Sequence, residues 1–228
     1  MLLWVSLAGA AVPSGAFLVG AAPGSDGEVT ASVTGFQVTD SSTRARFEGG
    51  LLETHVDLHD RATLTIGLAY DDYDMGVLPH FGVRTLIVDQ EHIRFGFHLQ
   101  SGAWLKLSES DEYDDRTGIG IGWALEAGGE RVVVDATRTP FAAHSWESDW
   151  DGERYWDPAR GEFQELGLSV IYGGHRARLG LLGLTPVAGY TYDHGSWFVR
   201  AMGGYAPETD WATYRGFLVS AGVRGELF

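Results

Sequence analysis

Cysteine is absent from this sequence, proline is scarce, and basic side chains are outnumbered by acidic ones. Without cysteine, the 228-residue chain can form neither a disulfide scaffold nor a thiolate metal site. Its 7 prolines and 32 glycines follow no collagen-like period and form no proline-rich linker. The formal net charge of −15 repels polyanions, which excludes DNA and RNA as partners.

Long apolar runs are also rare, and the one candidate lies at the start of the chain. Residues 1–24 carry no charged side chain, and the run MLLWVSLAGAAV has the length of the apolar region of a signal peptide. Small residues at 14–16 or 19–21 offer cleavage sites. A transmembrane helix is the competing interpretation, but Pro13 and the glycines at 9, 15 and 20 disfavour it. We therefore expect a signal peptide over residues 1–21 and a single β-barrel domain over residues 22–228.

From about residue 28 onward, apolar residues recur with a period of two. In the stretch 92–107, for example, Ile93, Phe95 and Phe97 share one face of a strand, while Arg94 and His98 lie on the other. The pattern predicts an all-β chain with about twelve strands, with eight or ten as alternatives. We place the strands at 29–38, 44–58, 62–70, 80–88, 92–107, 118–127, 131–138, 164–173, 176–184, 187–192, 196–205 and 213–228. The alternation breaks at residues 49–52, which predicts a β-bulge there.

The more polar face of these strands differs from the water-facing side of a soluble sheet. It is rich in glycine, and acidic and basic side chains stand singly among the glycines in comparable numbers. Small residues and compensated charges suit a narrow polar lumen, whereas the opposite face is nearly uncharged, as contact with lipid requires. A closed barrel is also the only sheet that satisfies every backbone group in hydrocarbon. The expected lumen charge network comprises Arg46, Glu48, Arg84, Arg94, His98, Glu126, Arg131, Asp135, Glu165, Arg178, Arg200 and Arg224.

The predicted connections alternate in length. Those after the third, fifth, seventh and eleventh strands are long and acidic (71–79, 108–117, 139–163 and 206–212), whereas those after the even-numbered strands are tight turns. In an up-and-down barrel all long loops then lie at one end and all tight turns at the other, as in bacterial outer-membrane barrels. The sequence therefore predicts a closed antiparallel up-and-down transmembrane β-barrel, located in the outer membrane with acidic extracellular loops.

On these features the chain resembles the broad class of small Gram-negative outer-membrane β-barrels. Its C-terminal GVRGELF is similar to their terminal strand, which ends in an aromatic residue read by the barrel assembly machinery. Here Phe228 is out of phase with the outward stripe that contains Val223 and Leu227, which departs from the usual signature. The resemblance implies outer-membrane lipid, lipopolysaccharide and the assembly machinery as partners, and it specifies no particular activity.

Residues 144–157 (HSWESDWDGERYWD) form the most unusual predicted loop. Asp149, Asp151 and Asp157 offer the hard oxygen ligands that Ca²⁺ prefers, although their spacing matches no EF-hand. Trp150 and Trp156 are suited to stacking on a sugar or to packing the loop onto the barrel mouth. Loop packing, a loop-bound Ca²⁺ and ligand recognition are thus the three interpretations, and no other cofactor is expected.

Two weaker constellations point to an enzyme. Asp71-Asp72 and Asp193-His194 resemble the acidic pairs of the omptin outer-membrane proteases, but the predicted topology separates them to opposite ends of the barrel. His98 and Ser101 are residue types of a lipid A deacylase, yet their three-residue spacing sets them on opposite faces of a strand.

The leading hypothesis is therefore a non-enzymatic outer-membrane barrel with a structural, adhesive or narrow, porin-like role. An outer-membrane enzyme that modifies lipid or peptide is one alternative. A soluble periplasmic β-barrel that binds a ligand is the other.

Overall fold

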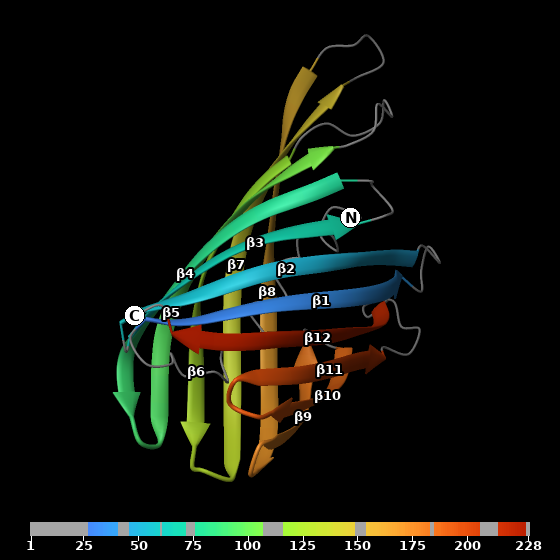
Figure 1. Cartoon of the computed structure of the whole chain (residues 1–228). Helices are drawn as coiled ribbons and strands as arrows, with labels where there is room; N and C mark the ends of the chain where they lie inside the picture. Colours follow the sequence, from blue (N-terminus) through green and yellow to red (C-terminus); the bar gives the residue numbers. More distant parts are fainter. Residues whose placement is uncertain are drawn as a thin grey trace.

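The computed structural model is a closed antiparallel barrel of twelve strands, which confirms the predicted fold class (Figure 1). It describes residues 27–40, 46–59, 61–71, 76–106, 116–148, 154–182, 185–205 and 214–226. Within these ranges, no helix is long and apolar enough to span a membrane. The strands are β1 (Glu28–Asp40), β2 (Arg46–His59), β3 (Ala62–Asp71), β4 (Gly76–Gln90), β5 (Ile93–Lys106), β6 (Arg116–Gly128), β7 (Val132–Ser148), β8 (Arg154–Tyr172), β9 (His175–Leu182), β10 (Thr185–Asp193), β11 (Trp197–Tyr205) and β12 (Tyr214–Glu226).

Each strand pairs with its neighbours in sequence, and the first strand pairs with the last. The β1–β12 ladder runs from Glu28 opposite Glu226 to Asp40 opposite Tyr214. The start of β1 and the end of β12 therefore lie at the same end of the barrel. The tight turns after the even-numbered strands lie at that end too, and we call it the turn end; the opposite end is the loop end.

Burial separates the two faces of every strand and inverts the pattern of a water-soluble protein. Outward apolar side chains are exposed, among them Val33, Ile121 and Leu179, each at 60% or more. Inward side chains are buried even when charged, and Asp135 is only 2% exposed. The predicted sorting of apolar and polar faces is thus present in the fold, because successive side chains of a strand point to opposite sides.

The predicted bulge at residues 49–52 is wrong. The β1–β2 register runs without a break from Val29 opposite Val56 to Thr39 opposite Arg46. Irregularities fall instead between Asp57 and His59 on β2 and between Leu86 and Val88 on β4. A glycine is required at position 49 by a close backbone contact and not by a bulge, because a Cβ there would lie 2.1 Å from the carbonyl oxygen of Tyr70.

The predicted long loop at 139–163 is also wrong, because most of it is strand. The β7–β8 ladder continues from Val132 opposite Val170 to Ser148 opposite Arg154. With 17 and 19 residues, these strands are longer than the roughly 9–11 residues that a tilted strand needs to cross a bilayer. Figure 1 shows the loop end of this hairpin standing beyond the neighbouring strands.

Candidate functional site

Charged side chains from many strands of the sheet point into the interior of the barrel, and we treat this interior as the candidate site. The sequence places these side chains there through the period of two, since each lies in phase with the buried residues of its strand. Two groups of hydrogen-bonded side chains lie within it, one around Arg178 and one around Glu53.

Arg178 on β9 binds two carboxylates at once. Its Nη1 donates to Glu165 on β8, and its Nη2 donates to Asp135 on β7, with a further Nε bond to Asp135 of 3.3 Å. Nη2 of Arg176 lies 3.7 Å from Oδ1 of Asp135, and Nε of Arg176 donates a hydrogen bond to the Ser169 hydroxyl at 3.0 Å. Because Arg178, Asp135 and Glu165 are removed from water, the pairing is what makes their burial tolerable.

A glycine makes room for this arginine. A Cβ on Gly167 of β8 would lie 2.3 Å from Nη2 of Arg178, closer than any real contact. Gly180 on β9 is needed for a different reason, because a Cβ there would meet the carbonyl oxygen of Leu166 at 2.4 Å. The glycines of the inward face thus provide the space that the long cationic side chains occupy.

The second group centres on Glu53 of β2. His80 on β4 bonds to its Oε1 at 3.0 Å, and His55 lies 3.9 Å from its Oε2 while bonding to Thr65 at 2.9 Å. Gly67 on β3 lies beneath His80, where a Cβ would come within 2.2 Å of the ring. Neither His55 nor His80 was predicted as a site residue, although His80 lies in phase with Arg84 on the same strand, which is a signal present in the sequence.

Two arginines from separate strands act electrostatically on the carboxylates and histidine of this region. Arg84 of β4 is attracted by Asp57 and Glu126, and Arg200 of β11 is attracted by Glu53 and Asp193. Both arginines act electrostatically on His55. The charges therefore interact across the interior and not only along neighbouring strands.

The turn end of the interior holds further ion pairs. Arg224 donates to both carboxylate oxygens of Asp193, at 2.8 and 2.7 Å, and lies 3.7 Å from Glu28. Arg94 lies 3.2 Å from Asp89 and 3.6 Å from Glu126. Toward the loop end, the inward side chains become apolar. On β2, for example, Leu51 lies closer to the loop end than Glu53 does. One apolar cluster there consists of Leu51, Ala69 and Leu78. A second consists of Val187, Met202 and Leu218, with Phe36 packed against it.

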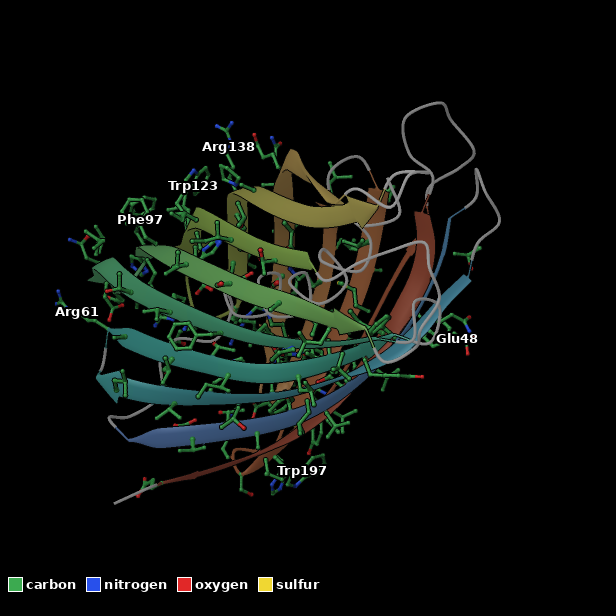
Figure 2. The ribbon with its side chains drawn as sticks, turned by 90° about the horizontal axis from the view of Figure 1, so that it is seen from above. Glu48, Arg61, Phe97, Trp123, Arg138 and Trp197 are labelled. Carbon is green, nitrogen blue, oxygen red and sulfur yellow. The ribbon has the colours of Figure 1, made fainter. Side chains whose placement is uncertain are left out.

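Most residues of the predicted network lie on the inward face, but three do not contribute described contacts there. Glu48 points outward, as Figure 2 shows, and accepts a hydrogen bond from Gln37 at 2.5 Å. It was placed inward because a bulge was assumed between it and Glu53. Arg131 is exposed in the β6–β7 turn, and the side chain of Arg46 lies outside the described part of the structure. The residues on the inward face are Arg84, Arg94, His98, Glu126, Asp135, Glu165, Arg178, Arg200 and Arg224.

The predicted loop site falls largely outside the described residues. Asp149, Trp150 and Asp151 are not described, and Trp156 and Asp157 belong to β8 with undescribed side chains. Among the residues that are described, no cluster of three or more His, Asp or Glu side chains could hold a metal ion.

The structure does not assemble the two enzyme-like constellations. Asp71 ends β3 at the loop end, whereas Asp193 ends β10 at the turn end and is bound by Arg224. His98 is buried in the interior and bonds to Thr139 at 2.7 Å, while Ser101 is exposed on the outward face.

Comparisons with known proteins identify the fold. No family model matches the chain, and no curated protein matches it in sequence. An outer membrane channel from Pseudomonas putida F1 superposes with a TM-score of 0.63 at 12% identity, covering 90% of this chain and 98% of that one. The translocator domain of the autotransporter NalP from Neisseria meningitidis gives 0.55 at 12% identity, over 97% and 95% of the two chains. The β domain of the Bordetella autotransporter BrkA gives 0.56 at 17% identity, over 89% and 100%. This chain therefore has the fold of outer-membrane β-barrels.

Replacing Arg178 with methionine should lower the free energy of unfolding by about 3–5 kcal/mol, because Asp135 and Glu165 lose the guanidinium that they share. Urea unfolding of the refolded barrel measures this change. A combined R178M/E165Q variant should recover part of the loss, since Asp135 keeps Arg176 as its partner and no second carboxylate is left without a cation. An R178M barrel as stable as the unmodified protein would show that the pairing does not stabilise the fold.

Proposed function

We propose that this chain is a Gram-negative outer-membrane β-barrel whose lumen is closed by its own side chains and which has a structural or adhesive role at the cell surface. The burial of the interior charges carries this proposal. A pore filled with water keeps its lining charges hydrated, but here Glu53 and Glu165 are each only 4% exposed and Ser169 is fully buried. An interior packed in this way leaves no continuous path for hydrated solutes.

The outward face supports the membrane location. Every described strand carries exposed apolar side chains on this face, in the manner of a lipid-facing band. At the turn end, Tyr192 and His194 contact Trp197 at ring distances of 5.4 Å, and Tyr172 is 79% exposed. Aromatic rings of this kind are typical of a membrane interface, and the tight turns at this end fit the periplasmic side.

The β7–β8 hairpin supports the surface role. In the proposed orientation its extended part stands outside the membrane, where a paired two-stranded ribbon offers a surface for contact. The proposal also implies lipopolysaccharide and outer-membrane lipid as partners, together with the assembly machinery that inserts such barrels.

The lipid-facing assignment can be tested on one strand. Ile121 lies at the middle of β6 and Thr117 near its loop end, both on the outward face. In lipid vesicles, Ile121→Arg should destabilise the barrel by about 2–4 kcal/mol, and Thr117→Arg by about 0–1 kcal/mol, because the penalty depends on depth in the bilayer. Equal and small effects of both substitutions would favour a soluble barrel instead.

The closed lumen can be tested in planar bilayers. The unmodified barrel should show no steady open state, whereas R84A/R200A should conduct, because two inward side chains from separate strands are removed. The matched control is R61A/R131A, which removes two exposed arginines from turns and should stay closed. Steady conductance of the unmodified barrel would show that its lumen is a narrow pore and is not closed.

A further inference from the structure

The outward face of β12, β1 and β2 is uncharged over most of its length and becomes charged near the loop end. Outward positions carry no charge over residues 217–225 of β12, 29–37 of β1 and 50–58 of β2. Each stretch has about the 9–11 residues that a tilted strand needs to cross a bilayer. The stretch on β12 includes Val223, which lies opposite Trp197 of the aromatic group at the turn end. We therefore expect the first charged positions beyond these stretches to lie at the opposite surface of the membrane.

A hydrogen-bonded polar pair marks the level at which the uncharged stretches end. Nε2 of Gln37 on β1 donates to Oε1 of Glu48 on β2 at 2.5 Å, and Figure 2 shows Glu48 on the outside of the wall. Phe217 on β12 lies opposite Gln37 and is 54% exposed. An aromatic ring and a polar pair thus stand side by side at this level, which is typical of the surface of a membrane.

Two arginines follow one step closer to the loop end. The register sets Thr39 of β1 opposite Arg46 of β2 on one side and opposite Arg215 of β12 on the other. All three positions share the outward phase of their strands. Because neighbouring strands are about 4.8 Å apart, the Cα atoms of the two arginines lie about 10 Å from each other. The segments that connect the strands at this end are rich in acidic residues and contain no basic residue except Arg44, so these two arginines supply positive charge where it is scarce.

The outward ion pair of Arg138 and Glu162 lies at a different level. Arg138 on β7 donates to both carboxylate oxygens of Glu162 on β8, at 2.5 and 2.8 Å. It lies opposite Trp123, and Ile121 and Ile119 continue the apolar outward face of β6 from there toward the loop end. This pair therefore stands within the apolar band, whereas Arg46 and Arg215 stand beyond it.

We propose that Arg46 and Arg215 form a binding site for the phosphates of lipid A, the membrane anchor of lipopolysaccharide, an inference that rests on the proposed outer-membrane location. A guanidinium can bind phosphate through two parallel hydrogen bonds, which suits arginine to this headgroup. The exposed side chains of Phe217, Val219 and Leu52 then provide the surface on which the acyl chains lie.

The groups around the arginines suit the sugar part of the same lipid. Thr39 lies between the two arginines and has a hydroxyl, which can both donate and accept a hydrogen bond. Gln37 and Glu48 lie one step nearer the apolar band and bring amide and carboxylate groups to the outside of the wall. Sugar hydroxyls need such a mixture of donors and acceptors, whereas acyl chains need none.

The separation of the two arginines favours lipid A over a phospholipid. Lipid A carries a phosphate at each end of a disaccharide, so two cations on separate strands can each bind one phosphate. A phospholipid such as phosphatidylglycerol has a single phosphate and a short headgroup, and it leaves one of the two arginines without an anion.

The test adds lipid A to the refolded barrel in detergent and measures its binding by native mass spectrometry. R46A/R215A should bind lipid A about tenfold more weakly or worse, because charge-assisted contacts to phosphate are lost. R46K/R215K keeps both charges without the planar fork and should lose less affinity. The matched control is R61A/R131A, which removes two exposed arginines at the turn end and should bind lipid A like the unmodified barrel.

A second measurement compares lipid A that carries both phosphates with its monophosphoryl form. The unmodified barrel should prefer the form with both phosphates by about tenfold, because each phosphate has its own arginine. R46A/R215A should bind the two forms equally. A double variant that keeps the full preference would place the phosphate contacts elsewhere and contradict the inference.

Three further results would overturn the inference. One is unchanged lipid A binding by R46A/R215A, and another is equal binding of phosphatidylglycerol and lipid A by the unmodified barrel. The third is covalent dimerisation of Thr39→Cys in membranes, which would assign this face to a second copy, since the chain has no other cysteine. Outer-membrane fractionation checks the proposed function separately: a barrel that fractionates correctly but binds no lipid A contradicts only this inference.

Discussion

The closure of β1 on β12 is the constraint on which the rest of the structure depends. A sheet in hydrocarbon has no solvent to satisfy its edges, so every strand must find two neighbours. Once the ring is closed, each side chain faces either inward or outward, and the period of two in the sequence becomes a division between interior and exterior. A ring of this size has little interior volume, so long inward side chains must share it and their charges must be compensated there.

The inward glycines and the inward charged side chains share that limited volume. Gly67, Gly122 and Gly167 each lie where a Cβ would collide with an inward His or Arg side chain. The high glycine content and the balanced charges are therefore one feature: residues without side chains border the residues whose side chains fill the interior.

The fold was predictable from the sequence because it depends on periodicity, and each of the twelve predicted strands overlaps an observed one. The partners within the site were not, because they depend on register, and a shift of one residue exchanges the faces. Glu48 illustrates this: an assumed bulge placed it inward, whereas the unbroken β1–β2 register places it outward. The outer part of β7 and β8 was missed because residues 139–163 do not alternate apolar and polar side chains.

The Arg138–Glu162 pair shows where periodicity stops being informative. Its chemistry is that of the Arg178 group, and only its phase along β7 and β8 sets it outside the barrel. Inside, a charge is tolerated because a partner and the packed wall enclose it; outside, the same ion pair is tolerated only where the surroundings are themselves polar. An outward ion pair therefore marks a polar patch on the outer surface of the wall, formed here by Arg138, Glu162 and Gln164.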